Sequence, residues 1–229
     1  MHIPDGFIDP VTAAAAGVVA ATGAGVALRK AGRDLDDRLV PLAGLVAAYV
    51  FAGQMVNFPV AGGTSGHLLG GALAAVLVGP WLGVLCLTVV VAVQALLFAD
   101  GGLSALGLNT LNMALVATLG GYVAFRVVHG ASGRRQSTAP LAAGVAAWVS
   151  VVLASLAFSA EYAVGGAGGA DLATVTSAMV GVHVLIGVGE GVITALTVGA
   201  VLAARPDLVR GIVVERPAPT AGPDPVAAR

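Results

Sequence analysis

Long apolar stretches, separated by short polar or glycine- and proline-containing segments, make up most of this chain. A helix that crosses a bilayer needs roughly 20 consecutive apolar residues. Stretches of about that length cover residues 10–28, 39–58, 62–79, 81–99, 108–128, 141–160 and 174–204. Only Gly79-Pro80-Trp81 marks a turn between the third and fourth stretches, because residues 67–99 carry no Asp, Glu, Lys or Arg. The pattern predicts an all-α membrane protein with seven transmembrane helices.

The basic residues indicate an orientation for these helices. All 11 lysines and arginines fall within residues 29–38, 126–135 and 205–229. Cytoplasmic loops collect Lys and Arg, so these three segments should share the cytoplasmic side. An even number of crossings between the first two segments requires the turn at Gly79-Pro80. We therefore expect the N-terminus outside and the C-terminus in the cytoplasm.

Composition narrows the class of protein further. Apolar residues make up 58% of the 229 and charged residues 10%, against about 25% charged residues in soluble domains. A net charge of -1 excludes a polybasic protein that binds nucleic acid. The single cysteine, Cys86, excludes a disulfide framework and a cysteine-based metal cage. We expect one transmembrane domain over residues 1–204 and a disordered, solvated cytoplasmic tail over the proline-rich residues 205–229.

Candidate chemistry begins at the first two residues. The N-terminal sequence lacks the basic region of a cleavable signal peptide, so we expect the protein to keep Met1. His2 can then chelate a metal through the Met1 α-amine, its own deprotonated backbone amide and its imidazole Nδ1. Such fused rings suit tetragonal Ni(II) or Cu(II), and imidazole suits nickel, copper and cobalt. His67 follows a glycine-rich loop on the same predicted outer side and is the natural fourth nitrogen donor.

Other polar residues have less specific interpretations. His183 and Glu190 share a face of the last predicted helix but lie about 10 Å apart along its axis, so they cannot both bind one ion. We expect them to form structural hydrogen bonds or to couple the site to partners, and we interpret His129 as an interfacial loop residue. Amide side chains within the spans are expected to bridge helices; these are Gln54, Gln94, Asn109 and Asn112. Candidates for orienting His67 are Asn57, Thr64, Ser65 and Asp100.

Four motifs resemble the CbiM/NikM family, the substrate-capture (S) subunits of energy-coupling-factor (ECF) transporters for cobalt and nickel. They are Met1-His2-Ile3-Pro4-Asp5-Gly6-Phe7-Ile8, residues 59–68 (PVAGGTSGHL), residues 98–107 (FADGGLSALG) with Asn109 and 112–114, and residues 183–191 (HVLIGVGEG). The resemblance implies seven helices and a square-planar site of four nitrogens from Met1, His2 and His67. It also implies a multi-pass protein of a prokaryotic cell membrane that has no cofactor of its own and carries Ni(II) or Co(II) as its substrate.

The resemblance further implies partners that supply energy. Members of the family dock on a transmembrane coupling subunit with two ATP-hydrolysing subunits and, in some systems, a small accessory membrane subunit. The chain itself has no G-x-x-x-x-G-K-[ST] phosphate loop, which agrees with a subunit that is not an enzyme.

Two alternatives stay open at this point. An intramembrane metalloenzyme would need an H-E-x-x-H pair or paired carboxylates, and the spans contain neither. A capture subunit for an organic micronutrient would need aromatic side chains for stacking, and the aromatic content is 5%. The choice of metal is open as well. A square-planar nitrogen set favours Ni(II), whereas neighbouring genes for cobalamin biosynthesis would favour cobalt.

Overall fold

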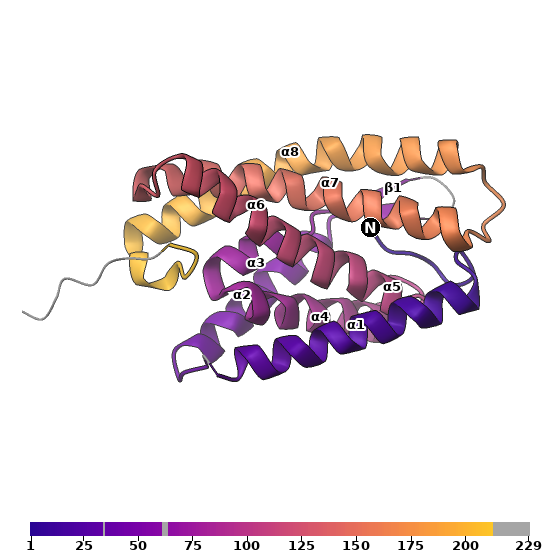
Figure 1. Ribbon diagram of the computed structural model, residues 1–229, viewed down its shortest axis with the longest axis horizontal. Helices are drawn as coiled ribbons and strands as arrows, with labels where there is room; N and C mark the ends of the chain where they lie inside the picture. The colour runs from indigo at the N-terminus through magenta and orange to yellow at the C-terminus, as the bar shows by residue number, and fades with distance from the viewer. Residues whose placement is uncertain (34, 61–63, 213–229) are drawn as a thin grey trace, which may run out of the picture.

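The computed structural model describes residues 1–33, 35–60 and 64–212, which form an elongated helical bundle (Figure 1). Two short strands, β1 and β2, pair antiparallel, with Phe58 opposite Gly66. Residues 106–131 run as one continuous helix whose middle part, η2, is π-helical. In chain order the elements are α1 (Pro10–Ala31), α2 (Leu39–Gln54), β1 (Phe58–Pro59), β2 (Ser65–Gly66), α3 (Gly71–Val78), α4 (Pro80–Leu97), α5 (Leu106–Asn109), η2 (Thr110–Val116), α6 (Ala117–Ala131), η3 (Gln136–Thr138), α7 (Ala139–Gly165), α8 (Leu172–Ala204) and η4 (Pro206–Leu208).

Five helical segments among the described residues are long and apolar enough to cross a membrane. They are Pro10–Ala31, Pro80–Leu97, Leu106–Ala131, Gln136–Gly165 and Leu172–Ala204. Large apolar side chains lie exposed on the outside of the bundle, including Leu97 at 75% and Leu185 at 73% exposure. A surface of this kind is stable against hydrocarbon, where there is no cost of exposing apolar atoms to water.

The expected third span over residues 62–79 is wrong as a continuous helix. Its helical part, α3, has 8 residues, which reach only about 12 Å at 1.5 Å per residue. The chain before α3 holds β2 and an irregular stretch that ends at Gly70, whose φ of 75° permits the sharp approach to the helix. All 8 residues of α3 are buried, so the apolar run reflects burial within the protein and not length across lipid.

The predicted turn between the third and fourth segments is confirmed. Helix α3 ends at Val78 and α4 begins at Pro80, because proline has no N–H to lose in the first turn of a helix and its φ suits that position. Gly79 between them has a φ of 88°, which a residue with a side chain rarely adopts.

The helix boundaries correct two expectations. Helix α7 continues to Gly165, past the predicted end at residue 160, so Glu161 lies within it, and its Oε2 accepts a hydrogen bond of 2.6 Å from Asn112 Nδ2. His129 is not an interfacial loop residue. It lies buried in α6, stacked on Phe125 with 5.2 Å between the ring centroids.

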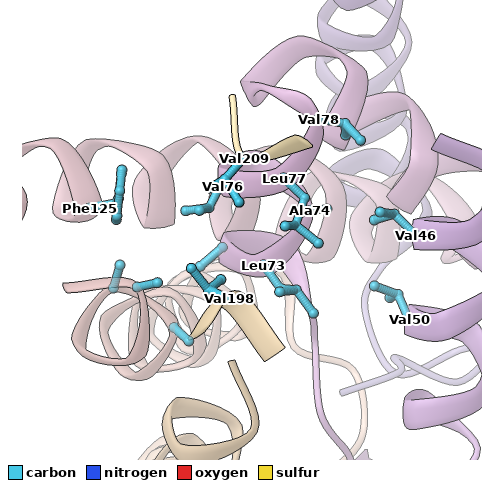
Figure 2. Close-up of a cluster of buried hydrophobic side chains, with 14 of the residues drawn as sticks. Val46, Val50, Leu73, Ala74, Val76, Leu77, Val78, Phe125, Val198 and Val209 are labelled. Carbon is cyan, nitrogen blue, oxygen red and sulfur yellow. The ribbon is translucent and has the colours of Figure 1, made fainter. Parts of the chain in front are cut away.

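The main core surrounds α3. Figure 2 shows α3 side chains such as Leu73 and Val76 between Val46 and Val50 of α2, Phe125 of α6 and Val198 of α8. The chain after α8 joins this core, since Val209 and Ile212 are buried there. The backbone N–H groups of Arg210 and Gly211 donate to Leu77 O and Val76 O, which are carbonyls at the end of α3. Residues 205–212 are therefore folded, in contrast to the tail that we expected from Arg205, and residues 213–229 lie outside the described part.

The segments that carry the described basic residues gather at one end of the bundle. The α1–α2 connection, the α6–α7 connection and the chain after α8 share that end in Figure 1. The Lys30 ammonium lies 4.0 Å from the centroid of the Trp81 ring, which ties the end of α1 to the start of α4. The α7–α8 connection and the start of α1 lie at the opposite end (Figure 1). The bundle therefore has one basic end and one end that lacks basic residues in the described chain.

Candidate metal centre at the N-terminus

The residues before α1 fold inward, so that the N-terminus lies in the middle of the bundle (Figure 1). Met1 is 1% exposed and Ile3 is fully buried. Main-chain hydrogen bonds hold this tail at both ends: Gly102 N donates to Ile3 O at 2.8 Å, and Asp9 N donates to Gly165 O at 2.7 Å. The tail is thus part of the packed structure, although it lies outside the helices.

Two amide side chains form hydrogen bonds with the tail, and not between helices as we expected. Asn109 Oδ1 accepts from Ile3 N at 2.8 Å, and its Nδ2 donates to Ile3 O at 3.2 Å, much as a neighbouring strand would. Gln94 Oε1 lies 3.1 Å from His2 Nε2. We missed these roles because the sequence pattern does not distinguish an amide that binds the tail from one that binds another helix. Of the four amides, Asn112 bonds to a neighbouring helix as expected.

Two glycines let the tail approach the α4–α5 connection. Gly101 has a φ of 92°, and a Cβ there would lie 3.0 Å from the His2 ring. A Cβ on Gly102 would lie 2.4 Å from Asp5 N, far inside van der Waals contact. The Gly101-Gly102 pair is therefore a steric requirement for the buried position of residues 1–5.

The structure brings His2 and His67 together in the interior. His2 Nδ1 lies 3.1 Å from His67 Nε2, and the two side chains are 3% and 0% exposed. His67 Nδ1 donates to Leu68 O at 2.7 Å. Because a carbonyl only accepts, the proton of a neutral His67 is on Nδ1, and Nε2 carries the lone pair that faces His2. Metal-binding histidines are commonly fixed in this way.

An acidic residue completes the surroundings of His2. Asp100 Oδ1 lies 3.0 Å from His2 Nδ1, and Asp100 Oδ2 accepts from Asn57 Nδ2 at 3.0 Å. With an acceptor on either side, His2 Nδ1 carries a proton in this arrangement. A metal ion bound at Nδ1 requires the neutral tautomer with its proton on Nε2, and Gln94 Oε1 lies 3.1 Å away to accept from it.

Burial also prepares the nitrogens to bind metal. Desolvation lowers the pKa of the Met1 amine well below its ordinary value, against the opposing charge of Asp100. Desolvation likewise lowers the pKa of His2, although the hydrogen bond with Asp100 opposes the shift. Burial raises the pKa of Asp100, but the hydrogen bond and charge of His2, with the Asn57 amide, outweigh burial and leave that pKa below its ordinary value. Neutral amine and imidazole nitrogens are the forms that bind a metal.

The residues that we expected around His67 mostly surround His2. Asn57 reaches His2 through Asp100, and Ser65 Oγ lies 3.5 Å from the His2 backbone N, a long and weak contact. Thr64 is buried, and its carbonyl accepts from Val60 N at 3.0 Å within the β1–β2 hairpin. Asn57, Ser65 and Asp100 therefore contact the tail directly or through one another, whereas the printed bond of Thr64 lies within the hairpin before His67.

Glu190 and Gln54 hold the segment that follows His67. The Glu190 carboxylate accepts from Leu69 N at 2.5 Å and from Gly70 N at 2.9 Å. Gln54 Nε2 donates to Leu69 O at 2.7 Å. Helices α8 and α2 thus fix the backbone two residues beyond His67. Glu190 therefore forms structural hydrogen bonds in the described part of the chain.

A divalent transition metal ion is held by several N, O or S donors. Within residues 1–33, 35–60 and 64–212, no group of three or more His, Cys, Asp or Glu side chains is arranged to hold a metal ion. A site at His2 and His67 must therefore recruit main-chain nitrogens. The buried Met1 amine and the weakly bonded His2 amide adjoin the imidazole pair, so the residues fit a nitrogen chelate and not a carboxylate cage.

Known proteins similar to this chain are metal transport proteins. Residues 2–208 match the family described as the cobalt uptake substrate-specific transmembrane region, CbiM. A putative metal transport protein of Haloquadratum walsbyi is 44% identical over 91% of this chain and 93% of its own length. A cobalt transport protein CbiM of Sorangium cellulosum is 37% identical over 79% of this chain and 81% of its own length.

Other relatives have nickel in their names or a solved structure. A putative fused nickel transport protein, NikMN, of Archaeoglobus fulgidus is 39% identical over 91% of this chain and 68% of its own length. The crystal structure of a truncated transition metal transporter superposes with a TM-score of 0.83 at 32% identity, over 89% of this chain and 99% of that one. These relatives are named as transport proteins and not as enzymes. The chain is therefore a multi-pass membrane protein that belongs to the CbiM family.

Proposed function

We propose that this protein is the metal-capture subunit of an ECF-type importer for Ni(II) or Co(II). The cation binds the Met1 amine, the His2 amide, His2 Nδ1 and His67 Nε2. The observation that carries the proposal is the meeting of His2 Nδ1 and His67 Nε2 at 3.1 Å in the interior, although 65 positions separate the two residues. The names of the cobalt and nickel relatives support the choice of substrate.

The spacing of the two imidazole nitrogens suits one shared ion. Two nitrogens bound about 2.0–2.1 Å from an ion and at right angles to each other lie about 2.9 Å apart. The separation of 3.1 Å is already close to this value, so binding requires only small movements of the two rings. Proton loss from the His2 amide accompanies binding, and the proton of the neutral His2 ring moves to Nε2.

The proposed topology keeps seven crossings with the N-terminus outside. The crossings are α1, α2, the α3 segment with its partly extended approach, α4, the helix over residues 106–131, α7 and α8. The basic end of the bundle then faces the cytoplasm, as the charge bias of membrane proteins requires. The tail chelate opens toward the opposite, outer end.

Capture and release are divided between this chain and its partners in the proposal. The chain binds the cation from outside, and a transmembrane coupling subunit with two ATP-hydrolysing subunits supplies the energy for release inward. A small accessory membrane subunit completes the assembly in some systems. Glu190 offers a physical connection, because it links α8 to the segment that carries His67.

Uptake of radioactive nickel and cobalt tests the proposal. Cells that express the chain together with coupling and ATPase subunits should accumulate one or both ions, and His67→Ala should abolish the uptake. His129→Leu is the matched control, since it removes another buried histidine at a distance from the site. Competition between the two ions in this assay identifies the preferred metal. Full uptake by the His67→Ala variant would contradict the proposed site.

A further inference from the structure

A small cavity lies at the basic end of the bundle, where the helix over residues 106–131 ends (Figure 1). Its volume is about 50 Å³, and it shares no residue with the candidate metal centre. The lining residues are Arg126, His129, Gly130, Arg134, Gly211 and Ile212. The chain after α8 forms one wall, since a Cβ on Gly211 would lie only 3.0 Å from Phe125 Cε1. With two arginines among its lining residues, the cavity is a candidate site for an anion.

The arginines of this cavity have no carboxylate partner in the described part of the chain. Both ion pairs found there involve other residues. Arg126 Nη1 donates to the Tyr122 hydroxyl at 3.1 Å, and the phenol brings no negative charge. The charged groups that act on the His129 ring are Arg134 and Arg126, so the potential at that wall is positive. An anion in the cavity would therefore meet two guanidinium groups that the described residues leave without a counter-ion.

The backbone of Arg134 is held at the end of α6. Arg134 N donates to His129 O at 3.0 Å, and Ser132 N donates to Val128 O at 3.1 Å, so carbonyls of the last turn are satisfied within the chain. The φ of Arg134 is 56°, in the left-handed region that few residues with a side chain adopt. The position of this arginine beside the cavity is thus fixed by the main chain and does not depend on a bound anion.

Exposed apolar side chains lead along α6 to the cavity. Val123 is 61% exposed and Val127 is 65% exposed. Residues three and four apart share a face of a helix, so Val123, Arg126 and Val127 lie on one face. Gly130 continues this face to the cavity, and a Cβ there would meet nothing within 4 Å. An apolar strip next to a pair of cations matches an anion that carries hydrocarbon better than a free anion.

We propose that this cavity binds the phosphate group of a membrane phospholipid, with Arg126 and Arg134 as the donors and the acyl chains along Val123 and Val127. Guanidinium groups bind phosphate oxygens through pairs of parallel N–H bonds. The apolar helix ends at Ala131, so the cavity lies at the depth where phospholipid headgroups meet water. Basic pockets between membrane helices bind anionic headgroups in the same way. The inference goes beyond the proposed function and does not depend on it.

Native mass spectrometry of the purified full-length chain, titrated with dioctanoyl phosphatidylglycerol, tests the proposal. The native chain should retain one lipid in a saturable manner. Arg126→Gln and Arg134→Gln should each weaken this binding by roughly 10-fold or more, because each removes charge-assisted hydrogen bonds. Arg135→Gln is the matched control, since Arg135 is exposed in the same connection but does not line the cavity. The control should lose only the general attraction of one surface charge, about 5-fold or less.

Three results would overturn the proposal. Equal losses in the three variants would show that the positive surface attracts lipid without a defined site. Inorganic phosphate that displaces the lipid at similar concentration would show a free-anion site in which the apolar strip has no part. Equal affinity for dioctanoyl phosphatidylcholine, whose ammonium cancels the phosphate charge, would show that the arginines do not select an anion. Circular dichroism of each variant should show native helix content, so that a loss of lipid reports on the cavity.

Discussion

Replacing Gly102 with alanine should weaken metal binding while leaving the helical bundle folded. The new Cβ would lie 2.4 Å from Asp5 N and 2.7 Å from Pro4 C. Since ordinary contact begins at 3.4 Å, the tail must retreat by about 1 Å. That movement also strains the hydrogen bond of 2.8 Å from Gly102 N to Ile3 O, which directly follows His2.

The size of the effect follows from the cost of overpacking. Forcing an extra carbon into a packed site costs about 1–3 kcal/mol. If only the docked tail binds the ion, the full free-energy cost of overpacking is subtracted from the binding free energy of Ni(II). It corresponds to roughly 5-fold to 150-fold weaker binding. Because Met1 and Ile3 are part of a buried cluster with helix side chains, the variant should also unfold at a somewhat lower temperature, while its helix content stays unchanged.

Isothermal titration of purified protein with Ni(II) measures this effect. Gly25→Ala is the matched control, because a Cβ at that position of α1 meets nothing within 4 Å. The control should bind Ni(II) like the native chain. Native affinity in the Gly102→Ala variant would refute the conclusion that the close approach of the tail builds the site.

Three further predictions test other parts of the account. Glu190→Gln should weaken Ni(II) binding about 10-fold, as for other residues that hold metal ligands in place; titration calorimetry checks this, and Glu161→Gln should bind like the native chain. Asn109→Ala should weaken binding through loss of both hydrogen bonds to Ile3, and proteolysis of the variant should cut the tail faster. Because burial lowers the pKa values of the Met1 amine and His2, Ni(II) binding should persist to lower pH than in a free Met-His-Ile-Pro peptide. Coincident pH midpoints for protein and peptide would contradict the desolvated site.

The sequence pattern predicted the helical membrane fold because apolar runs of spanning length have few alternatives to helices in a bilayer. The turn at Gly79-Pro80 was predictable, since proline begins helices and charge bias demanded an extra crossing. The length of α3 was not. An apolar run indicates that a segment is buried, but the sequence pattern does not distinguish burial inside the protein from burial in lipid.

The candidate site was partly predictable for a related reason. His2 and His67 were identifiable because a histidine at position 2 and a histidine after a glycine loop have specific chemistry. Gln94 and Asn109 were wrongly expected to bridge helices, because the sequence does not show that the tail folds inward to meet them. The inward path of the tail depends on the absence of side chains at Gly101 and Gly102. That steric effect acts between segments about 100 residues apart, so local sequence patterns do not reveal it.

The proposed site depends on the free amine of Met1 as a metal ligand, and this role sets it apart from an ordinary histidine site. It is tested most directly by Nα-acetylation of that residue, with the N-terminus confirmed by mass spectrometry and Ni(II) and Co(II) affinities measured by titration calorimetry. Acetylation removes one donor nitrogen and leaves every side chain in place. We expect tight binding to be lost in the acetylated chain and kept in the same preparation with a free amine. Equal affinities in the two forms would contradict it.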